Sequence, residues 1–265
     1  MSTPAAFRKG FVDDATALLP DSAVTLAEAA RAFEARASDE RQGGFLAHDT
    51  DVPQLRGFAG PLTVVITGGA GQIAGPAGLC TRLGLSLTRL HVTLRDPGDL
   101  RGNTRRVVAA VDDALEAGAL DEATEICIEV PGGSEAGWLD AADEVAAVEH
   151  RLALRPGASA SALVPWIDAS LDRETPFTVH GLSRAVTGSS SGPGFLNVLV
   201  ATQLLFDGGS DPVGALAETD ASALLGRTNP QDLLRARRWF TSFASEDIEA
   251  SLHDIDLLPE GWAAG

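Results

Sequence analysis

The stretch Val64–Gly75, with the sequence VVITGGAGQIAG, decides between two folds for this chain. An apolar run ends in Thr-Gly-Gly, and a helix-like segment follows it. In an open doubly wound sheet, such a turn binds the pyrophosphate of a dinucleotide at the start of a helix. In a (β/α)8 barrel it is a tight turn after one strand, whose backbone N–H groups can still receive an anion. The segments around it determine which fold applies.

Segments with strand and helix patterns alternate on both sides of this stretch. The apolar runs that we expect to be strands lie at 44–47, 62–69, 87–96, 124–130, 151–157, 176–182 and 239–245. Helical patterns separate these runs. The segment 194–209 is either a strand that runs into a helix or a helix throughout. Apolar strands that alternate with helices indicate a parallel sheet covered by helices.

The number of these segments favours a barrel. They make up to eight βα units, and a (β/α)8 barrel needs eight in about 250 residues. We therefore predict one α/β domain over residues 1–265, a TIM-type barrel that is irregular in its last third. Residues 1–40 are expected to form an N-terminal helical extension. An open doubly wound, Rossmann-like sheet is the alternative.

Several features speak against a dinucleotide site at Val64–Gly75. A helix pattern and an apolar run precede the stretch, and Ala74 stands where a third glycine is expected. The reductases and epimerases that share the TGGAG pattern use a tyrosine–lysine pair, but this chain has no tyrosine and its single lysine is Lys9. We expect no NAD(P). An NAD(P)-dependent oxidoreductase stays an alternative, because Asp96 is suitably spaced for a ribose contact.

The composition excludes some partners. A formal net charge of −17 argues against binding nucleic acid or an anionic membrane surface. The opening residues MSTPAAFRKG lack the apolar run of a secretory signal, and no apolar run is long enough to span a bilayer. Cys80 and Cys127 have no redox or metal-site spacing, so we interpret them as buried reduced thiols. We predict a cytoplasmic protein, with a homo-oligomer as an open alternative.

The active site of a (β/α)8 barrel lies where its strands end. Applied to the expected strands, this rule selects a catalytic set of Arg95, Asp96, Glu129, Arg155 and His180. Arg95 and Arg155 each end an apolar run, and a guanidinium group suits a carboxylate or phosphate. The alternative for both arginines is a structural ion pair with Asp96 or Glu129.

Glu129 and His180 are the candidates for proton transfer. Glu129 is predicted to be a general base, or else a ligand of Mg²⁺ together with Asp96, although no cofactor is firmly indicated. His180 is predicted to be an acid or base, and a hydrogen-bonded core histidine is the alternative. His91 lies inside its expected strand and is interpreted as structural.

Other polar residues near the strand ends are expected to bind substrate. They are Asp14, His48, Thr67, Gly68, Gly69, Arg184, Ser242 and Ser245. Asp13 and Asp14 come before any expected strand. They either reach the barrel mouth from a crossing segment, cap a helix, or form a solvated pair.

Six motifs are spread over most of the chain. They are FVDDATALLP, VVITGGAG, LALRPG, PFTVHGLSRAV, GFLNVLVAT and WFTSFASED. Together they resemble an uncharacterised bacterial family that is barrel-like and has no assigned activity. In that family the fourth motif usually contains Ala-Gly-Leu-His-His, whereas this chain has Ser183 and Arg184 in place of the two histidines. The resemblance implies a divergent member that has altered or lost the chemistry of that pair.

The chain also lacks several catalytic patterns. It has no G-x-S-x-G, H-E-x-x-H or Walker A motif, and no strand-borne lysine for a Schiff base. We therefore predict a lyase or isomerase for a carboxylated or phosphorylated metabolite. His180 and Glu129 would move protons, and Arg95 and Arg155 would hold the anion. The alternative is a non-catalytic barrel that serves as a binding or partner subunit.

Overall fold

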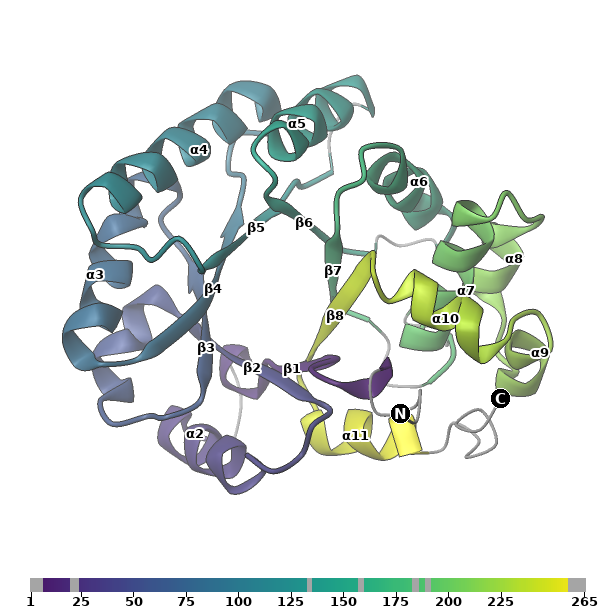
Figure 1. Ribbon diagram of the computed structural model, residues 1–265, viewed down its shortest axis with the longest axis horizontal. Helices are drawn as coiled ribbons and strands as arrows, with labels where there is room; N and C mark the ends of the chain where they lie inside the picture. Colours follow the sequence, from purple (N-terminus) through teal and green to yellow (C-terminus); the bar gives the residue numbers. More distant parts are fainter. Residues whose placement is uncertain are drawn as a thin grey trace. The chain divides into compact units, whose positions relative to one another are not determined.

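The computed structural model describes residues 7–19, 24–132, 135–156, 160–182, 186–188 and 192–256. Within these residues the strands form a closed barrel in chain order, from β1 to β8 (Figure 1). The strands are β1 Val12–Asp14, β2 Gln42–His48, β3 Pro61–Ile66, β4 Ser86–Thr93, β5 Glu125–Glu129, β6 Arg151–Leu154, β7 Phe177–His180 and β8 Phe240–Ser245. The predicted (β/α)8 barrel is confirmed, and the alternative of an open doubly wound sheet is wrong.

An α-helix lies between each pair of consecutive strands except β2 and β3, which are joined by a 3₁₀ turn. The α-helices are α2 Leu26–Ala35, α3 Ala74–Leu83, α4 Leu100–Glu116, α5 Glu135–Ala147, α6 Val164–Asp172, α7 Phe195–Phe206, α8 Pro212–Ala217, α9 Ala221–Leu225, α10 Pro230–Ala236 and α11 Ile248–Asp256. Short 3₁₀ turns are η1 Thr16–Leu18, η2 Asp49–Leu55, η3 Ala70–Gln72 and η4 Ala160–Leu163. Three short helices between α7 and β8 make the last third irregular, as expected.

One expectation about the strands is wrong, and one pair of alternatives is decided. The first strand is Val12–Asp14, so residues 1–40 are not simply a helical extension and Asp13 and Asp14 do not precede the barrel. Of the two alternatives for the segment 194–209, a helix throughout is confirmed, because Phe195–Phe206 is one helix buried over nearly its whole length. Two adjacent aspartates concealed β1 in the sequence.

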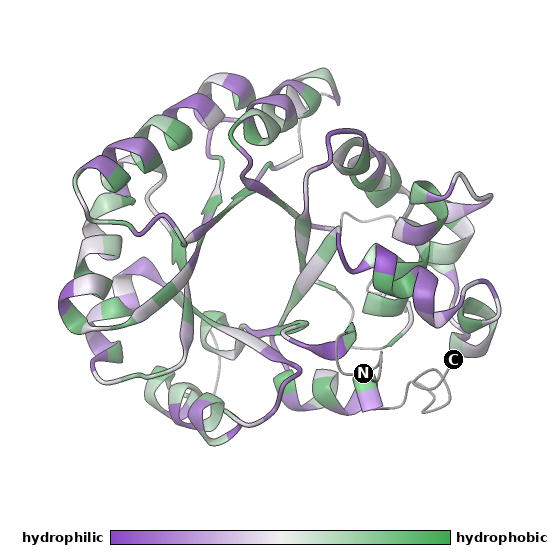
Figure 2. Cartoon of the chain, in the orientation of Figure 1, coloured by the Kyte–Doolittle hydropathy of each residue, from purple (hydrophilic) through white to green (hydrophobic). Residues whose placement is uncertain are grey.

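By its contacts the chain divides into two compact units. One comprises residues 14–39 and 44–153, and the other comprises residues 1–13, 40–43 and 154–265. In the first unit, β3, β4 and β5 pair in parallel, with α3 and α4 outside them (Figure 1). Helix α4 carries hydrophilic and hydrophobic residues in alternating bands (Figure 2) and buries the hydrophobic ones.

Side chains on β4 and β5 alternate between two environments. Leu90 and Val92 are fully buried on one face of β4, and Arg89 and His91 lie on the other. On β5, Ile126 and Ile128 are likewise buried and apolar, and Glu125, Cys127 and Glu129 occupy the other positions of the alternation. One side of the β4–β5 pair therefore carries polar side chains that contact one another, Arg89 with Glu125 and His91 with Glu129.

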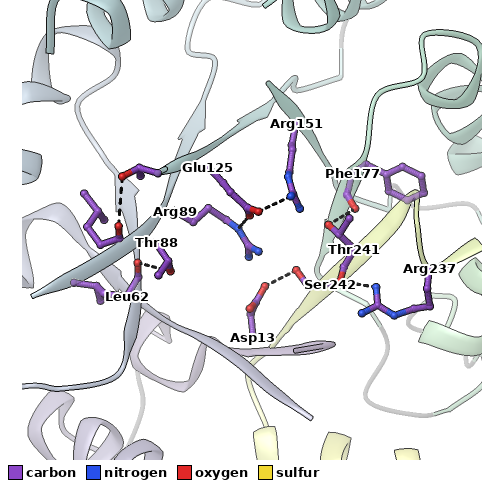
Figure 3. Close-up of polar contacts among 12 residues, drawn as sticks. Asp13, Leu62, Thr88, Arg89, Glu125, Arg151, Phe177, Arg237, Thr241 and Ser242 are labelled. Atoms are coloured by element: carbon purple, nitrogen blue, oxygen red, sulfur yellow. Dashed lines mark hydrogen bonds and ion pairs between the residues drawn. The ribbon is translucent and has the colours of Figure 1, made fainter. Parts of the chain in front are cut away.

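Charged side chains at the amino ends of these strands neutralise one another. Arg89 Nε lies 3.2 Å from Glu125 Oε2, and Arg151 of β6 forms a second ion pair with Glu125 Oε1 (Figure 3). One carboxylate thus bridges two guanidinium groups from neighbouring strands. Charges placed inside a protein are tolerated when they are paired and hydrogen-bonded in this way.

The second unit is built around Phe11 and Arg237. The Phe11 ring packs edge-on against Phe240 and Phe243, with centroids 5.2 and 5.1 Å away. The guanidinium carbon of Arg237 lies 4.1 Å from the centre of the Phe11 ring. Arg237 also donates to the backbone carbonyls of Phe7, Phe240 and Thr241. Burial lowers the pKa of Arg237 to about 10.

We predict that Arg237→Ala destabilises the protein by about 3 kcal/mol, because three carbonyl groups lose a charged donor and Phe11 loses its cation contact. Urea unfolding followed by circular dichroism measures the change. Arg238→Ala is the matched control, since Arg238 is exposed, and should alter stability by less than about 0.5 kcal/mol. Equal effects of the two substitutions would contradict the structural role of Arg237.

Candidate functional site

The ends of β2 and β3 are joined by a hydrogen bond. Thr67 Oγ1 donates to Asp49 Oδ1 over 2.7 Å, and Asp49 also accepts the backbone N–H of Thr50. Asp49 is buried and Thr67 is exposed. His48, the last residue of β2, is half-buried. The predicted residues His48 and Thr67 therefore lie at strand ends, as expected, and Asp49 fixes the loop that carries Thr67.

The glycine turn after β3 meets the loop after β4. Gly69 has φ 78° and ψ −165°, a backbone conformation that side chains other than glycine avoid. A Cβ atom at Gly69 would lie 3.2 Å from Arg95 Cδ, so the Arg95 side chain runs across the turn. Gly68 contacts the side chain of Gln72 in the same way. The Arg95 backbone N–H donates to Asn103 Oδ1 over 3.1 Å, which anchors this loop on α4.

Glu129 is paired with His91. The distance from His91 Nε2 to Glu129 Oε2 is 3.0 Å, and the two side chains are 3% and 8% exposed. In the β4–β5 register His91 pairs with Cys127, which lies two residues before Glu129. Side chains two residues apart on a strand point to the same face, so the side chains of His91 and Glu129 lie on the same side of the sheet. The sequence did not indicate this pair, and the interpretation of His91 as structural stays a prediction.

Asp96 lies in a different environment from Glu129. Its side chain is 55% exposed, Oδ1 accepts the backbone N–H of Gly98, and Oδ2 is 4.0 Å from Arg106. Asp96 thus shapes the exposed turn before α4. The proposed Mg²⁺ pair of Asp96 and Glu129 combines one exposed and one buried carboxylate, and the group that contacts Glu129 is an imidazole.

In the second unit, His180 ends β7 and is 8% exposed. Gly181 follows with φ 75°, and a Cβ atom there would lie 3.4 Å from Arg155 Nη1. Arg155 itself is exposed. The predicted residues Arg155 and His180 are therefore neighbours at the ends of β6 and β7. Ser183 and Arg184 lie outside the described residues.

Three of the expected substrate-binding residues are engaged by protein partners. Ser242 Oγ donates to Asp13 Oδ2 over 2.6 Å (Figure 3). Ser245 Oγ lies 2.7 Å from Ser251 Oγ and accepts the backbone N–H of Asp247. Asp14 forms an ion pair of 2.7 Å with Arg36 of α2. These contacts explain why the acidic β1 can be buried.

The structure also contains a cavity that the sequence did not indicate. It has a volume of about 350 Å³ and lies at the amino ends of β5 and β6, where His150 and Arg151 line it. Burial lowers the pKa of His150. This end of a (β/α)8 barrel is the one where active sites are not built.

The two cysteines are buried free thiols, as expected. Burial raises the pKa of Cys80 to about 11, so its thiol stays protonated and unreactive at neutral pH. Cys127 lies on β5 between the two glutamates of that strand.

Comparison with known protein families and with curated proteins gives no match to this chain. The resemblance to an uncharacterised bacterial family therefore stays a prediction. None of the helices in the described part of the chain is long and apolar enough to cross a membrane.

We predict that Gly69→Ala lowers stability by about 1–3 kcal/mol, because its backbone conformation is strained for any residue with a Cβ atom and Arg95 must move. Gly71→Ala is the control from the same turn, since a Cβ atom there meets nothing within 4 Å. Thermal unfolding of the two variants tests this prediction. A Gly69→Ala variant as stable as Gly71→Ala would show that the turn can relax.

Proposed function

We propose that the protein is a small-molecule enzyme, a lyase or isomerase that moves a proton on a carboxylated or phosphorylated metabolite. The observation that supports this most is the buried pair of His91 and Glu129, with 3.0 Å between Nε2 and Oε2. Hydrogen-bonded imidazole and carboxylate groups are the usual carriers of protons in enzymes. Burying both in a barrel interior costs free energy that a purely apolar core would not require.

In this proposal Glu129 receives a carbon-bound proton from the substrate. A carboxylate is a base, and a hydrogen bond from His91 fixes its orientation. His91 is then a positioning residue for Glu129. His180 keeps the role of a second acid or base, because it is buried at the end of its own strand.

Arginines at strand ends supply the proposed anion site. Arg95 is exposed and its side chain lies over Gly69, so a guanidinium group is available beside a turn with glycine backbone. A guanidinium fork suits a carboxylate or phosphate. In the second unit, Arg155 lies beside Gly181 as Arg95 lies beside Gly69. Both arginines stay candidates for holding the anionic group.

The glycine turn does not support a dinucleotide. Val64–Ile66 ends β3 of a closed barrel, and the turn leads into η3 and α3. The dinucleotide-binding turn works at the crevice of an open sheet, where the strand order reverses. In the barrel, Gly68 and Gly69 instead leave room for the side chains of Gln72 and Arg95, which pack closely against them.

Hydrogen–deuterium exchange tests the proposed proton transfer. The protein is incubated in D₂O with a panel of oxo acids, hydroxy acids, dicarboxylates and sugar phosphates, and NMR follows the loss of carbon-bound protons. We expect exchange with at least one compound, and Glu129→Gln should slow it by about 10²–10⁴-fold because the amide cannot accept the proton.

Glu122→Gln is the matched control, because Glu122 is exposed, and it should exchange at the wild-type rate. Circular dichroism confirms that each variant is folded. Unchanged exchange in Glu129→Gln would exclude Glu129 as the base, and the absence of exchange with every compound would argue against proton transfer on this substrate class.

A further inference from the structure

We propose that the cavity at the amino ends of β5 and β6 binds a small organic cation, an ammonium group on an apolar body. All residues that line this cavity lie between Val111 and Arg151, within one compact unit. Glu125 is one of them, and Glu129 lies four residues further along β5, about 13 Å away by the rise of a strand. The inference therefore concerns a second site, goes beyond the proposed proton transfer and does not rest on it.

The cavity has the size of a ligand site and a fixed rim. Its volume of about 350 Å³ is at the lower end of the range for small-molecule sites, which suits a single ring or a short chain. Backbone hydrogen bonds hold the two loops that border it. After α4, Gly118 N–H donates to the Leu115 carbonyl over 2.9 Å, and after α5, His150 N–H donates to the Val145 carbonyl over 3.2 Å. A rim held in this way costs a ligand little ordering.

The walls of the cavity are largely apolar. Val111, Leu120 and Ile126 line it and are at most 6% exposed. Val148 lines it too, and at 38% exposure it is one of the few large apolar side chains that face water in the described part of the chain. A ligand with an apolar body removes such surface from water, which favours binding.

The charge around the cavity selects a cation. The two segments that line it, residues 111–126 and 148–151, contain seven acidic residues and one arginine. That arginine, Arg151, forms an ion pair with Glu125, so its charge is compensated within the wall (Figure 3). Burial lowers the pKa of His150, so its imidazole is uncharged at neutral pH. The potential at the cavity is therefore negative, which attracts a cation and repels an anion.

Glu149 is the carboxylate whose contribution can be isolated, because the chain contains a matched counterpart. Glu149 follows α5 with φ 56°, and its N–H donates to the Ala146 carbonyl over 3.0 Å. Glu174 follows α6 in the same way, with φ 51° and a hydrogen bond of 3.0 Å to the Leu171 carbonyl. Both glutamates are exposed. Glu149 lines the cavity, whereas Glu174 belongs to the other compact unit.

Three probes that share a phenyl ring test the site: the cation 2-phenylethylamine, the neutral 2-phenylethanol and the anion 3-phenylpropanoate. Each is titrated into the ¹⁵N-labelled full chain at neutral pH and followed by NMR. We expect the amine to bind saturably with a dissociation constant of about 1 mM or lower. The alcohol should bind at least about 3-fold more weakly, and the anion more weakly still. The amides that shift should be those of residues 111–126 and 148–151.

Two pairs of variants separate the charge from the apolar wall. Glu149→Gln should weaken binding of the amine by about 2–5-fold and leave the alcohol unchanged, whereas Glu174→Gln should change neither. Val148→Ser should weaken amine and alcohol alike, by about 3-fold, because both lose the same apolar contact. Val213→Ser is its control, since Val213 is also exposed, at 45%, but lies on α8. Circular dichroism shows that each variant is folded.

Four results would overturn the inference: no saturable binding of the amine, tighter binding of the anion, shifts confined to residues outside the cavity, or equal effects of Glu149→Gln and Glu174→Gln. The deuterium exchange assay separates this site from the proposed reaction. Binding of the amine to a protein that exchanges no substrate proton would refute the proton transfer alone. Exchange in a protein that does not bind the amine would refute the cation site alone.

Discussion

The constraint on which the structure depends is that polar side chains facing a barrel interior must find partners there. Strands that close into a barrel have one face directed at the other strands, and charges on that face leave water. In the unit that contains β3, β4 and β5, Arg89, Glu125 and Arg151 satisfy this requirement together. In the other unit, Asp13 is satisfied by Ser242, and Arg237 by three backbone carbonyls.

This constraint explains what the sequence could and could not predict about the fold. The alternation of apolar runs with helical patterns is a local property, and it was sufficient to predict most of the strands and the barrel. Strand β1 could not be recognised, because two adjacent aspartates do not resemble a buried strand. Burial of Asp13 and Asp14 is tolerated because Ser242 and Arg36 pair with their carboxylates. Ser242 is far away in the sequence, and nothing in the sequence marks Arg36 as a partner of Asp14.

The same limit applies to the candidate site. The rule that barrel sites lie at strand ends selected Glu129, His180 and Arg95, and these residues do lie at or just after the ends of β5, β7 and β4, because the rule needs only the end of each strand. His91 was interpreted as structural, since nothing local distinguishes a histidine inside a strand. Its significance depends on the β4–β5 register and on the direction of its side chain, which bring Nε2 to Glu129 Oε2.

The two glutamates of β5 show how position along one strand separates structure from chemistry. Glu125 and Glu129 lie four residues apart on the same face, so they differ only in depth and neighbours. Glu125 forms ion pairs with two guanidinium groups, those of Arg89 on β4 and Arg151 on β6. Glu129 contacts a single imidazole nitrogen, that of His91, at 3.0 Å. The amino end of β5 therefore carries a network of ion pairs that ties three strands together, while its carboxyl end carries a buried imidazole–carboxylate pair of the kind that can move protons.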